Sequence, residues 1–268
     1  MPPVNKSFAI ARRDAQLTVA TFGTFWRSWA SIVGQVVTFY FLSKLIVRSP
    51  IFGVDGRPVP YFDYVAVNLA FLRFAATAIG SFQRAVRGDQ MMGTIEAMLV
   101  TPTSLSLLIV SSAIWSFVTT FLQMALFLGT ASFLGLNLFH TDLVTVGVFL
   151  ALTVFALSPL GIFSAATVML FKQAAPTTAL VGGFAALLSG TLFPVSKLPP
   201  YLQAASWMLP ITHALNGLRG GIGGASLSTV WPDALWLLVM GGISAPISLY
   251  VFTKAVRRAK MDGTLGDF

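Results

Sequence analysis

Few residues in this 268-residue chain have side chains suited to acid–base, nucleophilic or metal chemistry. The chain has no cysteine, which excludes disulfides, thiol catalysis and thiolate metal sites. Its two histidines, His140 and His213, lie far apart, and neither has an Asp or Glu at the sequence spacing of a metal site or a hydrolytic pair. No G-x-x-x-x-G-K-[ST] phosphate loop is present, and the Gly-rich run near Gly220 lacks its lysine. The sequence therefore predicts no catalytic, metal or cofactor site in this chain.

Arg73 is the charged residue with the least expected position, near the middle of an apolar stretch. An ionised side chain at the centre of a bilayer costs about 2.5–3.5 kcal/mol on insertion scales. Two interpretations stay open: a structural arginine bonded to backbone carbonyls, and an arginine that lines a substrate pathway and meets an anionic headgroup or phosphate. Arg73 and the adjacent Phe71 and Phe74 are our pathway candidates, although such rings often only pack against lipid or other helices.

The composition indicates an integral membrane protein. Apolar residues make up 56% of the chain and charged residues 10%, against about 45–50% and 25% in soluble proteins. Several apolar stretches are long enough to cross a hydrocarbon core about 30 Å thick, and uniformly apolar runs of this length are helices. The predicted spans are 29–47, 62–82, 105–134, 143–171, 177–193 and 234–252. The net charge of +8 comes mainly from Lys and Arg beside these spans, which is typical of membrane topology rather than of nucleic-acid binding.

Orientation follows from the positive charges in the short connections, most of which share a side with the N-terminus. We therefore expect a multi-pass protein of the cytoplasmic (inner) membrane with both termini in the cytoplasm. Ahead of the first span, residues 5–27 place apolar side chains on one helical face and predict an interfacial helix. The alternative is that this segment is the wet beginning of one long helix, which Gly23 and Arg27 argue against.

A polar interruption, RGDQMMGTIEAMLVTPTS, separates the second and third spans. Asp89 can cap a helix that begins near Gln90, and Thr101 before Pro102 can end it. Within the interruption, Met92, Ile95 and Leu99 align on one face, whereas Gln90, Thr94 and Glu96 lie mainly on others. The pattern predicts a short amphipathic helix over residues 88–101 on the cytoplasmic surface. Taken alone, such a helix is most simply a turn between two spans.

The segment 194–232 after the fifth span is divided by prolines into pieces of about ten residues, too short to cross a membrane. A helix end is expected next to each proline, including Pro232. Leu202, Ala205 and Leu209 share a face with Leu198, and aromatic anchors flank them, so we expect two half-helices that re-enter the outer leaflet as a lid. The outer gate candidates are Pro194, Leu198, Pro199, Tyr201, Trp207, Pro210 and Arg219.

Two of these segments, GTIEAMLVTPTS and FPVSKLPPYLQAASWMLPITHALNGLRG, resemble the two signatures of ABC-2 type permeases of ATP-binding-cassette exporters. They occur in the family's order with three spans between them, and the resemblance extends over nearly all of the chain. It implies a single all-α integral membrane domain over residues 1–268, with six transmembrane helices, an N-terminal interfacial helix, a cytoplasmic coupling helix and a re-entrant outer helical hairpin. It also implies that the coupling helix contacts an ATPase, through Asp89, Met92, Gly93, Thr94, Ile95, Glu96, Leu99, Thr101 and Pro102.

The function that the resemblance implies is that of a permease subunit rather than an enzyme. Such a subunit forms a homodimer, pairs with two copies of a P-loop ABC ATPase that binds ATP and Mg, and exports a drug, a lipid or a lipid-linked glycan. Membrane lipids surround it, and nucleic acid is not a partner. The rival interpretations are an ATP-independent membrane channel or scaffold, and a membrane-embedded enzyme. The enzyme would need converging His, Asp, Glu or Ser groups at one depth, which the sequence does not supply.

Overall fold

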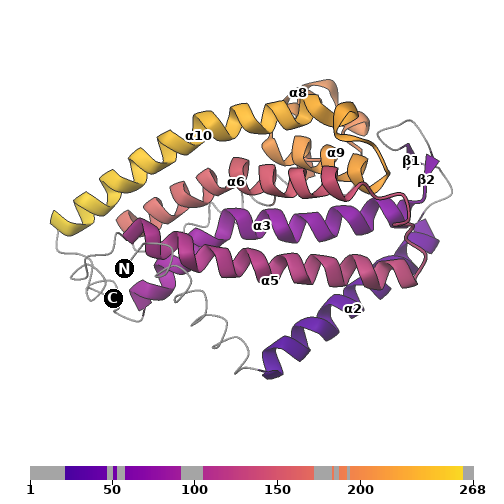
Figure 1. Cartoon of the computed structure of the whole chain (residues 1–268), viewed down its shortest axis with the longest axis horizontal. Coiled ribbons are helices and arrows are strands. Elements are labelled where there is room, and N and C mark those ends of the chain that lie inside the picture. The colour runs from indigo at the N-terminus through magenta and orange to yellow at the C-terminus, as the bar shows by residue number, and fades with distance from the viewer. Residues whose placement is uncertain are drawn as a thin grey trace.

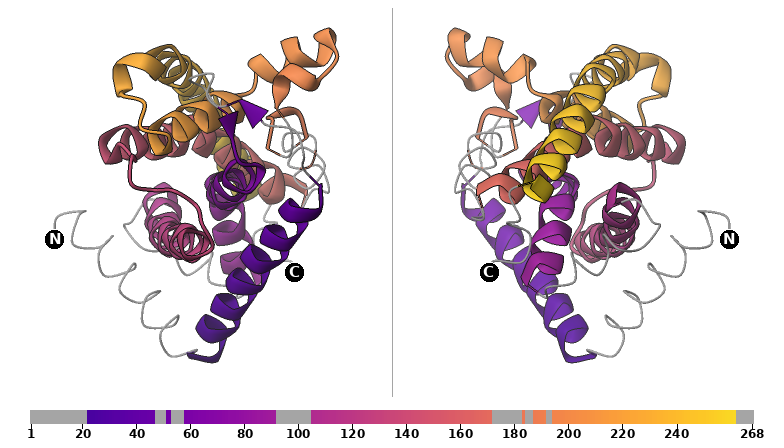
Figure 2. Two further views of the ribbon diagram at one scale, coloured as in Figure 1. Left: turned by 90° about the vertical axis from the view of Figure 1, so that its right-hand side faces the viewer. Right: turned by 90° about the vertical axis from the view of Figure 1, so that its left-hand side faces the viewer.

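The computed structural model describes residues 22–46, 51–52, 58–91, 105–171, 183, 187–191 and 194–261. Four long helices lie side by side in this part of the chain: α3 (Tyr61–Met91), α5 (Leu105–Phe133), α6 (Leu143–Phe171) and α10 (Leu227–Met261) (Figure 1). Each contains a stretch long and apolar enough to cross a membrane. Helix α2 (Phe22–Ile46) has a shorter apolar stretch, Ala30–Leu45, and leans away from the other helices at its N-terminal end (Figure 2).

Short elements cover one end of this bundle, which we call the hairpin end. They are β1 (Ile51–Phe52), β2 (Pro58–Val59), the 3-10 turn η1 (Val195–Lys197), α8 (Pro200–Trp207) and α9 (Pro210–Ile222). The two-residue strands pair antiparallel, with Ile51 opposite Val59. Helices α3, α6 and α10 start at the hairpin end and run to the opposite end of the bundle (Figure 1), which we call the distal end. Helix α3 is central, because 67% of its apolar window is buried against 22% for α5 and α10.

Glycines let the helices approach closely. A methyl group on Gly217 of α9 would lie 1.9 Å from a ring carbon of Phe149 on α6. A methyl group on Gly161 of α6 would lie 2.6 Å from the carbonyl oxygen of Ile79 on α3. Small residues at such contacts are typical of helix packing in membranes, where the attraction comes from close van der Waals contact rather than from the exclusion of water.

The long predicted spans correspond well to the helices. The prediction 143–171 coincides with α6, 105–134 runs one residue beyond the end of α5, and 62–82 lies inside the longer α3. The span 234–252 lies inside α10, but the helix end predicted beside Pro232 is wrong, because α10 already begins at Leu227. Pro232 lies less than two turns into α10, where its missing N–H removes only the hydrogen bond to Ser228. Six spans stay a prediction, since most of 177–193 lies outside the described residues.

Two other predicted helix boundaries are wrong. Helix α2 runs from Phe22 through Gly23 and Arg27 without interruption, so no break separates 22–27 from the first span, while residues 5–21 lie outside the described part. Helix α3 continues through Asp89 to Met91, so Asp89 does not cap a new helix. The stretch Tyr61–Met91 contains no proline, and one glycine costs a helix only about 1 kcal/mol relative to alanine. The rest of the predicted coupling helix lies outside the described residues.

Candidate functional site

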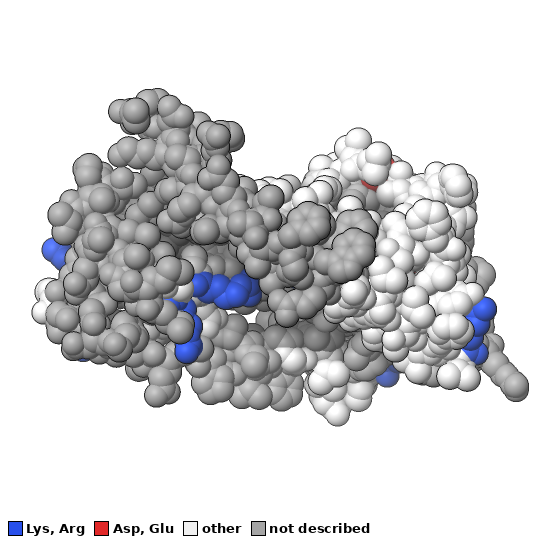
Figure 3. All heavy atoms as spheres, turned by 90° about the horizontal axis from the view of Figure 1, so that it is seen from below, with Lys and Arg blue, Asp and Glu red and all other residues white. Residues whose placement is uncertain are grey.

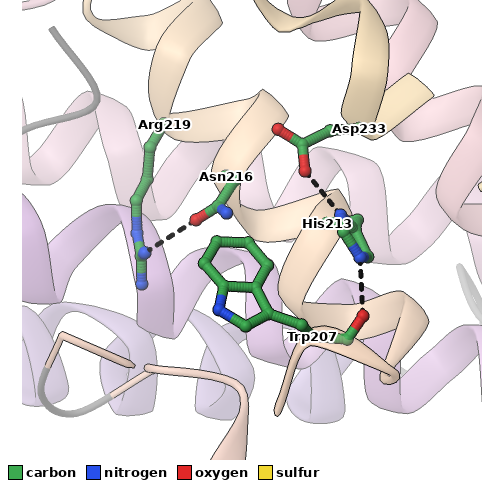
Figure 4. A network of polar contacts seen from close by, with 5 residues as sticks. All are labelled: Trp207, His213, Asn216, Arg219 and Asp233. Atoms are coloured by element: carbon green, nitrogen blue, oxygen red, sulfur yellow. Dashed lines mark hydrogen bonds and ion pairs between the residues drawn. The ribbon is translucent and has the colours of Figure 1, made fainter. Parts of the chain in front are cut away.

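Arg219, in the last turn of α9, joins the hairpin end to the central helix α3. Its Nε donates to Oδ1 of Asn68 at 2.7 Å, and its Nη2 donates to the carbonyl oxygen of Gly190 at 2.5 Å. The guanidinium carbon lies 4.3 Å from the centre of the Tyr64 ring, which adds a cation–π contact. A weaker contact of 3.5 Å joins Nη1 to Oδ1 of Asn216 (Figure 4).

Two side chains of α3 also bond to the backbone at Gly190 and Thr191. The hydroxyl of Tyr64 donates to the carbonyl of Gly190 at 2.6 Å, and Nδ2 of Asn68 donates to the carbonyl of Thr191 at 2.7 Å. We call these residues, Tyr64, Asn68, Gly190, Thr191 and Arg219, the gate cluster. It joins α3 and α9 to the turn at Gly190 and Thr191.

The charge of Arg219 is stabilised by neutral groups. Removal from water lowers its pKa to about 10, so the guanidinium still carries its charge at neutral pH. Among the described residues, no carboxylate forms an ion pair with it; the only such pair there joins His213 to Asp233. The oxygens of Asn68 and Gly190 and the face of the Tyr64 ring therefore take the place of a counterion. The charge is stabilised only while these groups keep their positions.

Sequence reasoning selected Arg219 but missed its α3 partners. The sequence did contain a signal for Asn68, which is the one side-chain amide in the apolar run Phe62 to Phe74. The structure buries it completely. A buried amide needs hydrogen-bond partners, which here come from residues more than 120 positions away. Sequence spacing cannot reveal such a distant pairing.

A second polar contact corrects the prediction that His213 has no acidic partner. Its Nδ1 lies 2.5 Å from Oδ1 of Asp233, and its Nε2 lies 2.8 Å from the carbonyl oxygen of Trp207 (Figure 4). The rings of Trp207 and Trp236 each lie 5.7 Å from the imidazole, and that of Trp236 is stacked on it. The partner was missed because α9 packs against α10, which brings a carboxylate twenty residues further along the chain to the imidazole.

This geometry favours the charged form of the imidazole. Both ring nitrogens of His213 face oxygen acceptors, and only the doubly protonated ring donates to both. Burial opposes the charge, but the hydrogen bonds to Asp233 and to the carbonyl of Trp207 outweigh it and raise the pKa of His213 above its usual 6.5. The pair links α9 to α10 and, through Trp207, to the end of α8.

Stability should therefore depend on pH through His213. A pKa raised by folding contributes stability that is complete below the unfolded value of 6.5 and is lost as the pH rises through the higher folded value. We expect wild type to exceed His213→Gln in thermal midpoint at pH 6 and this difference to shrink steadily toward pH 9. The measurement is thermal unfolding of the detergent-solubilised protein at a series of pH values. His140→Gln, at an exposed site, is the control; a constant difference between wild type and His213→Gln would refute the role of the charge.

The remaining gate candidates lie elsewhere on the hairpin. Pro210 is the first residue of α9, and Pro199 directly precedes α8, so the prolines begin these two helices as predicted. Tyr201 and Trp207 of α8 are 73% and 46% exposed, which suits interfacial anchors. The structure does not bring these side chains into the gate cluster. Pro194 and Leu198 flank η1 on either side and are partly buried. Re-entry of the hairpin into a leaflet stays a prediction.

The pathway candidates are divided by the structure. Phe71 and Phe74 are buried in the core at 1% and 4% exposure, and the ring of Phe74 lies 6.2 Å from that of Phe117. Arg73 is only partly buried, and its Nη2 donates to Oε1 of Gln35 on α2. The contact seen is therefore with a side-chain amide of a neighbouring helix rather than with a backbone carbonyl. Of the coupling-helix candidates, only Asp89 falls in the described part, within α3.

Comparison with known proteins gives consistent results. The family model described as ABC-2 type transporter matches residues 15–222, which include the polar interruption between α3 and α5 and the hairpin through the end of α9. The inner membrane transport permease YhhJ of Escherichia coli (strain K12) is 30% identical over 169 residues, which is 61% of this chain and 44% of that relative. The protein of the same name from Shigella flexneri gives the same figures. The match therefore spans less than half the length of these curated relatives.

Proposed function

We propose, from the premise that this chain belongs to the ABC-2 type transporter family, that it is the permease subunit of an ATP-driven exporter. The observation that carries the proposal is the family match over residues 15–222. Two relatives are described as inner membrane transport permeases, which supports a transport role in the cytoplasmic membrane. The chain is a multi-pass membrane protein and a transport subunit rather than an enzyme; the exporter's direction, its ATPase and its substrate are parts of the proposal.

In this proposal the energy comes from a separate subunit. Two copies of the chain pair with two copies of a P-loop ABC ATPase, which holds ATP and Mg²⁺. The segment after Met91 contacts that ATPase, with Glu96 facing a basic residue of the partner and Met92, Ile95 and Leu99 filling a groove. This chain contributes the contact, the pathway and the gate.

Helix α3 is suited to carry motion from the ATPase to the gate. It is 31 residues long without a proline, which corresponds to about 45 Å of continuous helix. One end adjoins the proposed ATPase contact, and the other carries Tyr64 and Asn68 of the gate cluster. A displacement at Met91 would therefore move the side chains that hold Gly190, Thr191 and Arg219 in place. We propose that this releases the hairpin and opens the outer side.

The charge distribution supports a distal end in the cytoplasm. Arg84 and Arg87 of α3 and Lys254, Arg257 and Arg258 of α10 are all exposed near that end. On the face shown in Figure 3, groups of blue atoms are visible among the coloured residues, one of them within a hollow. Positive residues remain preferentially on the cytoplasmic side of a membrane, so the hairpin end faces outward.

Reversing the charge of Glu96 tests the coupling role. Glu96→Arg is expected to remove most of the permease-stimulated ATPase activity, because it places two positive groups at the docking contact. The measurement is ATP hydrolysis by the complex co-purified from its own membrane and reconstituted in nanodiscs. Lys197→Glu, a charge reversal in η1 at the hairpin end, is the control and should leave the hydrolysis rate close to wild type.

Two results would count against the proposal. Full ATPase stimulation by Glu96→Arg would favour the channel or scaffold, which needs no docking helix. Native mass spectrometry of the protein extracted in several mild detergents gives the second result. A chain that is always isolated without an ATPase would also favour the channel or scaffold.

A further inference from the structure

One face of α3 carries three arginines, which are more exposed than most residues of this helix. At 3.6 residues per turn, Arg84 lies three full turns and about 20° beyond Arg73, and Thr77 and Gly80 fall between them on the same face. Arg87 lies about 40° from Arg73 and about 60° from Arg84 around the helix, so the row extends over about 21 Å. Most other positions of α3 are buried, whereas Arg73 is partly exposed and Arg84 and Arg87 are exposed. We call Arg73, Thr77, Gly80, Arg84 and Arg87 the arginine face.

Within the described part of the chain, carboxylates are scarce around this face. Helices α2, α5, α6 and α9 contain neither Asp nor Glu. Helix α3 has Asp63 in its first turn and Asp89 near its last residue, and α10 has only Asp233, which pairs with His213 at the hairpin end. The groups in contact with the face are neutral: Gln35 of α2 bonds to Arg73, and the hydroxyls of Thr77 and Thr120 lie 3.0 Å apart.

The Arg84 side chain lies back along α3 toward Arg73 rather than toward the distal end. A methyl group on Gly80 would lie 2.4 Å from Nη1 of Arg84, so the guanidinium is folded back over Gly80, one turn closer to Arg73. Side chains of a helix lean toward its N-terminus, which brings this guanidinium closer to Arg73. Within the described part of the chain, no hydrogen bond from this guanidinium to an acceptor is seen, and Arg84 is exposed as a residue. Gly80 provides the space that this conformation needs.

We propose that the arginine face binds the phosphate headgroup of an amphiphilic substrate and leads it from the distal end to the middle of α3. This rests on the proposed function as an exporter and names its substrate class. A guanidinium binds phosphate through two parallel N–H···O bonds, and the contact with Gln35 leaves Arg73 with further donors. The substrate's apolar chains stay in the surrounding lipid, while the headgroup passes from Arg87 to Arg84 and then to Arg73. The missing countercharge in the membrane is thereby supplied by the substrate.

The test measures ligand binding without the ATPase. The full chain in dodecyl maltoside is titrated with dioctanoyl phosphatidic acid, and its thermal midpoint is followed by tryptophan fluorescence, since a ligand that binds the folded state raises the midpoint. Two further probes separate the parts of the ligand: dioctanoylglycerol has the same chains without the phosphate, and inorganic phosphate has no chains. We expect stabilisation by phosphatidic acid alone.

Variants then locate the site. Arg73→Gln and Arg84→Gln should each weaken phosphatidic acid binding about tenfold or more, because each removes charge-assisted hydrogen bonds. Gly80→Ala keeps every charge but displaces the Arg84 guanidinium, a flexible group that can move without unfolding the helix, and should weaken binding in the same direction. Arg257→Gln, which removes a charge from an exposed site on α10, is the matched control and should bind like wild type.

Several outcomes would overturn the proposal. Equal stabilisation by inorganic phosphate would make the ligand a free anion, and equal stabilisation by dioctanoylglycerol would make the headgroup irrelevant. Unchanged binding in Arg73→Gln and Arg84→Gln would place the ligand elsewhere, and an equal loss in Arg257→Gln would show that only overall charge matters. If phosphatidic acid does not bind but Glu96→Arg still removes ATPase stimulation, the exporter role stands and only the proposed site is wrong. If phosphatidic acid binds as expected but Glu96→Arg leaves ATPase stimulation unchanged, the site stands and the exporter role is wrong.

Discussion

Replacing Arg219 by methionine is expected to destabilise the protein by about 3 kcal/mol, because it leaves the buried amide oxygen of Asn68 without a donor and removes the cation–π contact with Tyr64. The carbonyl of Gly190 keeps only its bond from Tyr64. For a chain of this size the loss corresponds to a fall of about 6–12 °C in the thermal midpoint. The measurement is thermal unfolding in detergent at pH 7.

Two further variants show whether the loss comes from the gate cluster. Arg219→Lys keeps the charge but cannot reproduce the geometry of the guanidinium, so it should recover only part of the stability. Asn68→Ala combined with Arg219→Met should cost less than the sum of the single changes, since both remove the same hydrogen bond. Lys197→Met, a similar change at an exposed cation of the hairpin end, is the control. An Arg219→Met protein as stable as this control would show that the cluster contributes nothing.

Adding one methyl group at Gly217 is the second change with a large expected effect. In Gly217→Ala the new Cβ would lie 1.9 Å from a ring carbon of Phe149, whose side chain is fully buried and cannot move aside freely. Overpacking of a close-packed interior costs about 1–3 kcal/mol, occasionally more, and here the clash forces α9 away from α6. We expect a lower thermal midpoint and a shift of the hairpin that also disturbs Arg219, two residues further along the helix.

The controls for Gly217 use the same chemistry elsewhere. Gly147→Ala on α6 has open space around the added methyl group, so this change should be neutral or slightly stabilising. A smaller partner, as in Gly217→Ala with Phe149→Val, should restore part of the stability lost by the single change. Equal stability of Gly217→Ala and Gly147→Ala would contradict the close contact between α9 and α6.

These contacts suggest how a small movement could become a large one. The gate cluster connects the central helix to the hairpin through Tyr64, Asn68 and Arg219, and the Gly217 contact presses α9 against α6. The His213–Asp233 pair attaches the same helix to α10. Helix α9 is thus held on three sides by contacts of different kinds, and a packed interface of this type switches between discrete arrangements rather than deforming continuously.

The sequence by itself determined the membrane class, the long helices and the family. Uniform apolar runs leave a chain in lipid no alternative to internal hydrogen bonding, so 62–82, 105–134 and 143–171 could be recognised as helices. The prolines at Pro200 and Pro210 begin α8 and α9 because a missing N–H costs nothing in a first turn. The same kinds of local signal were wrong elsewhere, because α3 continues through Asp89 and α10 continues through Pro232.

Only the tertiary structure decided which polar groups meet. Arg219 and Asn68 are 151 residues apart, His213 and Asp233 are twenty, and Arg73 finds its amide on another helix. Periodicity reports which face of a helix is apolar, but not which face of which other helix it will contact. The physical reason is that long-range pairing depends on how the helices pack, a property of the whole chain that no local stretch of sequence contains.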